Sequence, residues 1–284
     1  MTPVLIKTIH EARERCDELR RAGRLGFVPT MGALHRGHGA LIDQARQECA
    51  GVAVSIFVNP TQFDRKEDYE HYSRNLVADL EFCAERGVDL VFAPDAAEMY
   101  PSPLKTFVEV TDLSERLCGH FRPGHFRGVA TVVAKLFQIV QPDVAYFGEK
   151  DAQQLAIVRR MTADLNFPVE ITAVTTVREA DGLALSSRNE RLGQEERQIA
   201  PRLFVALEAA RQAVEAGKSV NEAKQAGLAT LRGIRQMNVE YFEVVDGEMQ
   251  PVTKIEGPVR ILVAAWLGGT RLIDNVLTNA AARA

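Results

Sequence analysis

Two histidines with the spacing His-x-x-His stand just after the first apolar stretch that is typical of a strand. That stretch covers residues 25–28, and His35 and His38 follow it with Gly37 between them. In an open parallel sheet, ligands bind beyond the carboxyl ends of the strands, where the N-terminus of the next helix offers N–H groups and a positive dipole to phosphate. Two imidazoles add directed donors, and glycine lets the backbone approach a nucleotide closely. The spacing therefore predicts a phosphate-binding entry to a helix.

Two other interpretations of the histidine pair stay open. A metal site is the weaker one, because no neighbouring acidic or cysteine ligand completes it and the spacing is not the His-Glu-x-x-His zinc pattern. Alternatively, the two side chains only cap the helix or lie in a loop.

A polar loop ends the second predicted strand, which covers residues 52–58. Asn59 and Gln62 in this loop would face the same strand-end crevice. A glutamine supplies a donor and an acceptor without charge, which suits the hydroxyls and carboxylate of a small substrate. A simple turn at Asn59 explains that residue better than it explains Gln62.

Charged and hydroxyl groups follow two further strand-like stretches. Lys150 comes after residues 144–147 and can offset phosphate charge, while Asp151 is placed to cap the next helix or to contact a nucleotide. Residues 186–188 bring two serine hydroxyls and a guanidinium together, a combination that clamps phosphate well. Solvated surface turns are the alternative at each place, but four such segments at strand ends favour phosphate chemistry.

Strand-like and helix-like stretches alternate through the first part of the chain. The apolar runs that predict strands cover residues 25–28, 52–58, 88–93, 144–147 and 169–177, and helical spacing between them covers about 38–50, 71–86, 129–141 and 151–164. Alternation of this kind predicts an α/β fold, a Rossmann-like doubly wound parallel sheet with helices on both faces.

The pattern changes after about residue 185. Helical patterns at 193–216 and 219–232 are followed by strand-like runs at 239–245 and 259–266. This order predicts a second, smaller α+β domain. We expect a catalytic domain over residues 1–184 and a lid domain over residues 185–284.

Five segments, in order, resemble the pantothenate synthetase (pantoate–β-alanine ligase) family. They are residues 29–38 (PTMGALHRGH), 57–63 (FVNPTQF), 122–129 (RPGHFRGV), 147–151 (FGEKD) and 186–189 (SSRN). The first also resembles the HIGH motif of the nucleotidylyltransferase superfamily. The resemblance extends over about residues 3–275. It implies that pantoate attacks the α-phosphate of ATP to give pantoyl adenylate and pyrophosphate, that β-alanine then displaces AMP, and that Mg²⁺ accompanies ATP.

The resemblance also implies roles for individual residues. His38 would be the proton donor, with His35 and Lys150 stabilising phosphate charge. Gln62 and Gln154 would bind pantoate. The residues implied to bind ATP are Met31, Gly32, Ala33, Leu34, His35, Arg36, Gly37, His38, Gly148, Glu149, Lys150, Asp151, Val177, Leu185, Ser186, Ser187 and Arg188. It assigns no residue to a metal, and it implies a homodimer, to which an apolar strand at 107–110 could contribute an edge.

Three positions depart from the family pattern. Arg36 stands where glutamate is common, Leu185 where methionine is usual, and Ser73 where proline often follows the tyrosine. None of these changes removes a group that the implied chemistry needs.

Composition excludes several classes of protein. With 34 Lys+Arg against 38 Asp+Glu, the net charge of the 284 residues is −4, which argues against nucleic acid as a partner and against a synthetase that acts on tRNA. No apolar run reaches the ~18–20 residues that span a bilayer, so we expect no membrane insertion. No signal-like segment follows the first residues, and four widely spaced cysteines suit buried free thiols, so we expect a cytoplasmic protein.

Two rival functions remain beside the ligase. One is a nucleotidylyltransferase that stops at the adenylylated product, against which Gln62, Gln154 and the Ser-Ser-Arg segment count. The other is a non-catalytic nucleotide-binding module, which ATP binding without catalysis would favour.

Overall fold

The computed structural model describes residues 2–279 and forms two compact units. The first unit comprises Met1–Gly148 and Ile157–Thr175, and the second comprises Glu149–Ala156 and Thr176–Ala284. These units are groups of residues in mutual contact, and they do not coincide with the expected domains of residues 1–184 and 185–284. Those domain limits stay a prediction.

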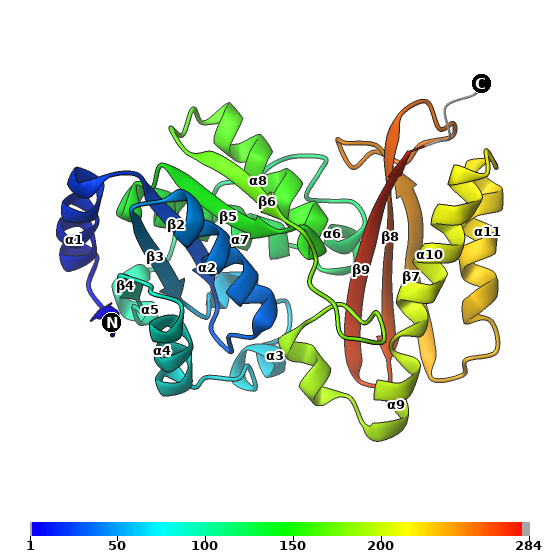
Figure 1. The fold of residues 1–284 in the computed structure, drawn as a ribbon, viewed down its shortest axis with the longest axis horizontal. Coiled ribbons are helices and arrows are strands. Elements are labelled where there is room, and N and C mark those ends of the chain that lie inside the picture. Colours follow the sequence, from blue (N-terminus) through cyan, green and yellow to red (C-terminus); the bar gives the residue numbers. More distant parts are fainter. Residues whose placement is uncertain (1, 280–284) are drawn as a thin grey trace. The chain divides into compact units, whose positions relative to one another are not determined.

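A six-stranded parallel sheet forms the centre of the first unit (Figure 1). Its spatial order is β1-β4-β3-β2-β5-β6. The strands are β1 (Val4–Ile6), β2 (Leu25–Thr30), β3 (Gly51–Ile56), β4 (Leu90–Phe92), β5 (Val144–Gly148) and β6 (Glu170–Val174). The strand order reverses beside β2, which pairs with β3 on one side and with β5 on the other. Such a reversal is where open α/β sheets place their ligands.

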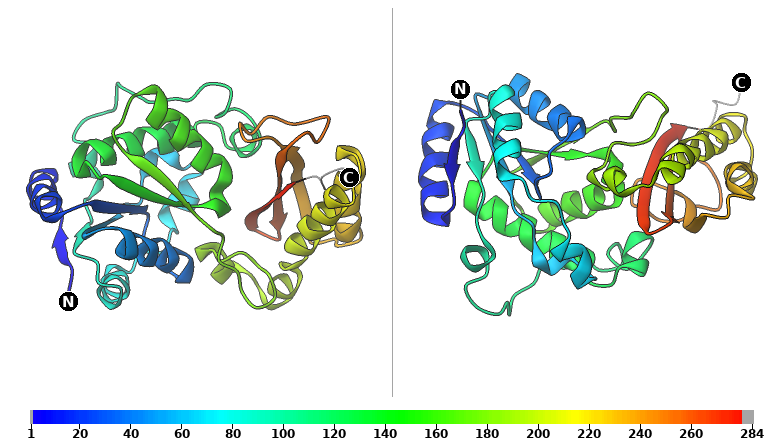
Figure 2. Two further views of the ribbon diagram at one scale, coloured as in Figure 1. Left: turned by 45° about the horizontal axis from the view of Figure 1, so that its top comes forward. Right: turned by 90° about the horizontal axis from the view of Figure 1, so that it is seen from below.

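Helices lie on both faces of this sheet (Figure 2). The helices along residues 9–164 are α1 (Ile9–Ala22), α2 (Arg36–Glu48), α3 (Lys66–Glu70), α4 (Leu76–Glu85), α5 (Ala96–Met99), α6 (Cys118–Phe121), α7 (His125–Val140) and α8 (Ala152–Asp164), of which α8 begins in the second unit. Helix α2 buries Leu41, Ile42 and Ala45 at helical spacing against β2, β3 and β5.

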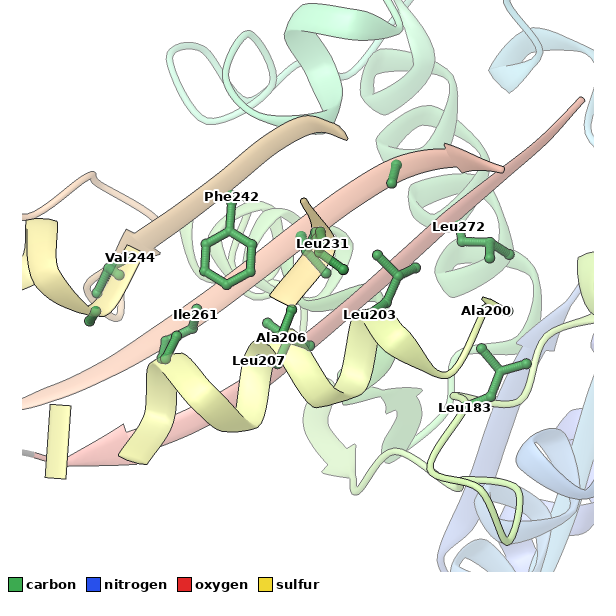
Figure 3. Close-up of a cluster of buried hydrophobic side chains, with 14 of the residues drawn as sticks. Leu183, Ala200, Leu203, Ala206, Leu207, Leu231, Phe242, Val244, Ile261 and Leu272 are labelled. Atoms are coloured by element: carbon green, nitrogen blue, oxygen red, sulfur yellow. The ribbon is translucent and has the colours of Figure 1, made fainter. Parts of the chain in front are cut away.

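The second unit packs helices on an antiparallel sheet. Its helices are α9 (Gln194–Ile199), α10 (Arg202–Glu215) and α11 (Val220–Leu231), and its strands are β7 (Met237–Val245), β8 (Pro258–Leu267) and β9 (Thr270–Asn279), in spatial order β7-β8-β9. Leu203 and Leu207 of α10 meet Phe242 of β7 and Ile261 of β8 in the core of this unit (Figure 3). Gly227 of α11 allows the close packing, because a Cβ there would lie 2.3 Å from Phe242 Cζ.

The predicted fold class is confirmed, and so is the order of the predicted strands and helices. The structure also contains β1, α1 and β9, which the sequence patterns did not predict. No helix among residues 2–279 is long and apolar enough to cross a membrane. All four cysteines are free and buried, as expected, and burial raises the pKa of Cys16 and of Cys83 to about 12.

Three local predictions were wrong. The helix expected over 71–86 begins only at Leu76, because Asn75 caps it by accepting the N–H of Ala78 at 3.2 Å. The helix expected over 193–216 is two helices, since Pro201 has no N–H to continue the first one. Residues 107–110 do not form a strand; the N–H of Val108 donates instead to Thr131 Oγ1.

We expect Leu207→Ala to lower the free energy of unfolding by about 2–5 kcal/mol, because Leu207 is fully buried and the truncation leaves a cavity. Val205→Ala, on the same helix but 41% exposed, should change it by less than about 0.5 kcal/mol. Denaturant titration of both variants measures the difference. Equal losses would show that α10 is not packed as the structure has it.

Candidate active site

The segment that carries the two histidines leaves β2 in a left-handed turn. Gly32 has φ +80° and Ala33 has φ +51°, after which His35 caps α2. Thr30 supports the turn, since its hydroxyl donates to the carbonyl of Ser55 and accepts the N–H of Gly32. Glycine is needed at position 32, because a Cβ there would lie 2.8 Å from a carboxylate oxygen of Asp79.

Backbone N–H groups fix the orientation of both imidazoles. The N–H of Gly37 donates to Nδ1 of His35 at 3.1 Å, and the N–H of His35 donates to Nδ1 of His38 at 3.3 Å. The ring centroids are 4.1 Å apart. Because each Nδ1 accepts a hydrogen, each neutral ring carries its own proton on Nε2. The helix entry thus has two oriented N–H donors of the kind that bind phosphate oxygens.

Asp79 of α4 holds the turn before these histidines. Its carboxylate accepts the N–H of Leu34 at 2.8 Å and the N–H of Ala33 at 3.1 Å, and the residue is only 4% exposed. Burial raises the pKa of Asp79, while the two N–H groups oppose that rise. A buried carboxylate therefore fixes the backbone that leads into α2.

Gln62 lies in a short 3₁₀ turn, Pro60–Gln62, and contacts the same segment. Its Oε1 accepts a hydrogen from Nδ2 of Asn59 at 3.0 Å, and its Nε2 lies 3.1 Å from Met31 Sδ. Asn59 is buried, and its Oδ1 accepts the hydroxyl of Tyr100 at 2.7 Å. Asn59 thereby orients the Gln62 amide so that it offers N–H donors, which suit a carboxylate or hydroxyl.

Residues 122–129 (RPGHFRGV) form hydrogen bonds with the loop that contains Gln62. His125 Nδ1 lies 2.7 Å from the carbonyl oxygen of Gln62, and Asn59 Nδ2 donates to the carbonyl of Gly128. Gly128 must be glycine, because a Cβ there would lie 2.3 Å from the carbonyl oxygen of Thr61. This segment of α7 positions the polar loop, a role that sequence reasoning did not assign to it.

In the second unit, hydrogen bonds connect the turn that contains Lys150 to strand β9. Residues Glu149–Asp151 form a 3₁₀ turn, and Nδ2 of Asn275 donates to the carbonyls of Glu149 at 2.9 Å and of Lys150 at 3.0 Å. Arg260 of β8 donates to Asn275 Oδ1 and lies 3.4 Å from a carboxylate oxygen of Glu149.

Asp274, the neighbour of Asn275 on β9, binds Arg178. Both Nη atoms of Arg178 donate to its carboxylate, at 2.6 and 2.9 Å. Burial raises the pKa of Asp274, and the charge of Arg178 and, more weakly, that of Lys150 oppose the rise.

The remaining predicted ATP-binding residues of the second unit also gather locally. The N–H of Leu185 donates to the carbonyl of Val177 at 3.0 Å. This bond connects two predicted ATP-binding residues that lie eight positions apart in the sequence. Ser186 caps the 3₁₀ turn Ser187–Arg191 by accepting the N–H of Arg188. Gln154 lies in the first turn of α8 and is partly buried.

Each unit thus brings together its own share of the predicted residues. Residues 31–38 and Gln62 meet in the first unit, whereas residues 149–151 and the pair Val177 and Leu185 belong to the second. Sequence reasoning missed Asp79 and Asn275. The available signal was an acid at helical spacing from the apolar residues Leu76 and Cys83, and a polar pair in the apolar run 272–277.

Among residues 2–279, no three His, Cys, Asp or Glu side chains form a group that could hold a metal ion. Mg²⁺ in phosphate chemistry usually keeps several waters and binds one or two carboxylates together with substrate phosphates.

Comparisons with known proteins agree with the resemblance seen in the sequence. Residues 4–277 match the family described as pantoate-beta-alanine ligase. A pantothenate synthetase from Heliobacterium modesticaldum is 51% identical over 278 residues, which cover 97% of this chain and 99% of the relative. One from Pseudothermotoga lettingae is 47% identical, with 96% of this chain and 98% of the relative covered.

Solved structures show the same similarity. Pantothenate synthetase from Thermus thermophilus superposes with a TM-score of 0.92 at 49% identity, covering 96% of this chain and 98% of that one. Pantoate-beta-alanine ligase from Francisella tularensis, solved in complex with beta-gamma ATP and beta-alanine, gives a TM-score of 0.81 at 35% identity, with 97% of each chain covered. A family match over residues 4–277 and relatives near half identity show that the chain belongs to the pantoate–β-alanine ligase family.

Proposed function

We propose that this protein condenses pantoate with β-alanine to pantothenate, using ATP and releasing AMP and pyrophosphate. One observation carries the proposal beyond family membership. At the start of α2, His35 and His38 both have Nδ1 occupied by a backbone N–H, so that both rings donate from Nε2. The same two hydrogen bonds cap the start of α2, as the alternative interpretation of the pair expected, and they place the hydrogen of each ring on Nε2, from which it can stabilise phosphate charge.

The first step is adenylyl transfer. A carboxylate oxygen of pantoate forms a bond to the α-phosphorus of ATP, and the bond from that phosphorus to the bridging oxygen breaks, releasing pyrophosphate. Negative charge meets negative charge, so donors and cations must surround the phosphates. We assign this task to His35, His38 and Lys150. As the proton donor, His38 offers its Nε2 hydrogen to a phosphate oxygen in a hydrogen bond, and the proton stays on the ring. We assign ATP binding to residues 31–38, 148–151, Val177 and 185–188.

We assign pantoate binding to Gln62 and Gln154. Gln62 offers N–H donors because Asn59 already engages its acceptor oxygen, which suits the carboxylate and hydroxyls of pantoate. We assign Gln154 to the same substrate on the family resemblance.

The second step forms the amide. The nitrogen of β-alanine attacks the acyl carbon of pantoyl adenylate and loses a proton, and AMP leaves with the former carboxylate oxygen. The chain itself forms no covalent bond in either step.

Three further features belong to the proposal. Mg²⁺ enters with ATP and offsets phosphate charge when bound. The family resemblance suggests a homodimer, and the four buried free cysteines suit a reducing cytoplasm.

Pyrophosphate exchange tests the proposed reaction. With Mg²⁺, labelled pyrophosphate should pass into ATP when pantoate is present and without any need for β-alanine, because adenylyl transfer is reversible before the amine reacts. Addition of β-alanine should then release AMP.

Other small carboxylates serve as the control for substrate class. If pantoate supports no exchange while the protein still binds ATP, the ligase proposal is wrong and a binding role takes its place. Exchange that is supported equally by unrelated carboxylates would refute the assignment of the substrate.

We expect Asp79→Ala to slow pantoate-dependent exchange by about tenfold to a hundredfold, because the N–H groups of Ala33 and Leu34 lose their acceptor and the turn before His35 is no longer held. Glu81→Ala, an exposed acid on the same helix, should exchange at the wild-type rate. Exchange rates and melting temperatures of the two variants measure the effect. A normal rate in Asp79→Ala would show that the turn needs no support from α4.

A further inference from the structure

Asn275 connects strand β9 to the turn that carries Lys150, although 125 residues separate them in sequence. The side chain is 4% exposed and uses both of its amide hydrogens on this turn, one to the carbonyl of Glu149 and one to the carbonyl of Lys150. Its oxygen accepts a hydrogen from Arg260, whose guanidinium also approaches the Glu149 carboxylate. The amide nitrogen of Asn275 is therefore bonded to the turn, and its oxygen is bonded to Arg260, which also contacts the turn.

The turn itself is short. It is three residues long and lies between the last residue of β5, Gly148, and the first residue of α8, Ala152. A 3₁₀ turn of this length makes only a few backbone hydrogen bonds of its own, and each carbonyl oxygen has a second lone pair that a side chain can engage. Asn275 supplies partners for two consecutive carbonyls and so fixes the backbone from which the Lys150 side chain extends.

Charged residues at or near the turn include Asp274, Arg178 and Lys150. The negative charge of Asp274 is paired with Arg178 through two hydrogen bonds. Its carboxylate therefore does not require the Lys150 ammonium as a partner. The Lys150 side chain can then pair with a polyanion, provided that its backbone holds it in the right place.

We propose that Asn275 is a positioning residue for Lys150: by holding the carbonyls of Glu149 and Lys150, it places the lysine ammonium for contact with the phosphates of ATP. The inference rests on the proposed function, because Lys150 is the group through which Asn275 acts.

A double-variant cycle tests this. Wild type, Asn275→Ala, Lys150→Ala and the double variant are compared in two assays, calorimetric binding of ATP with Mg²⁺ and the rate of pantoate-dependent pyrophosphate exchange. We expect Asn275→Ala to reduce the exchange rate or the ATP affinity by about tenfold or more, since misplacement by about 1 Å has an effect of this size. The double variant should be no worse than Lys150→Ala alone.

Two outcomes overturn the inference. One is an Asn275→Ala variant with unchanged ATP affinity and unchanged exchange. The other is a full additional loss in the double variant, which would mean that Asn275 acts on something other than Lys150. A wild type that binds ATP but shows no exchange with pantoate would refute the proposed function alone, because the binding cycle would still decide the role of Asn275.

Two more variants separate positioning from folding. Thr278→Val alters another buried polar residue of β9, whose hydroxyl contacts Glu215 and not the Lys150 turn, and it should leave both assays unchanged. Asn275→Asp keeps the shape and the acceptor for Arg260 but lacks both donors, so it tests the inference even if the alanine variant does not fold. It should lose as much as Asn275→Ala, and a wild-type rate in it would contradict the proposal.

Discussion

Backbone groups in a turn between a strand and a helix need partners from outside that turn, and this constraint shapes the two turns that carry most of the predicted site residues. In the first unit, Asp79 accepts the N–H groups of Ala33 and Leu34; in the second, Asn275 donates to the carbonyls of residues 149–150. A carboxylate matches two donors and an amide matches two acceptors. Leaving one such buried group without a partner costs about 1–3 kcal/mol, so each of these side chains stabilises one conformation of its turn.

Hydrogen bonds of this kind also determine which predicted site residues are neutral and which are charged. The imidazoles of His35 and His38 accept backbone N–H groups at Nδ1, so each neutral ring carries its hydrogen on Nε2. In the proposed reaction both rings donate to phosphate and Lys150 supplies positive charge, while Arg178 is occupied by the buried Asp274. Groups oriented before the substrate arrives need little reorganisation during the reaction, and this is the main way in which a site stabilises charge that develops between a carboxylate and a polyphosphate.

Local sequence predicted the parallel sheet and the strand-end motifs, because alternating apolar periodicity and glycine-rich strand ends are short-range signals. It failed where a distant contact or a single residue decides the outcome. Strand β9 escaped prediction because Asp274 and Asn275 interrupt its apolar pattern, and both are explained only by partners about 95 residues or more away. Asp79 was missed for the same reason, and the start of α4 was misplaced because the cap at Asn75 outweighs apolar spacing. The motif residues were thus predictable, whereas the residues that hold them were not.

The central claim is that the pantoate carboxylate attacks the α-phosphate of ATP. Pantoate labelled with ¹⁸O in its carboxylate tests this directly, with mass spectrometry of the products after a reaction with ATP and β-alanine. The account predicts one ¹⁸O atom in AMP, because the carboxylate oxygen that bonds to the α-phosphorus leaves with AMP when the amide forms. Label in inorganic phosphate, with ADP as the nucleotide product, would contradict it and indicate an acyl phosphate instead.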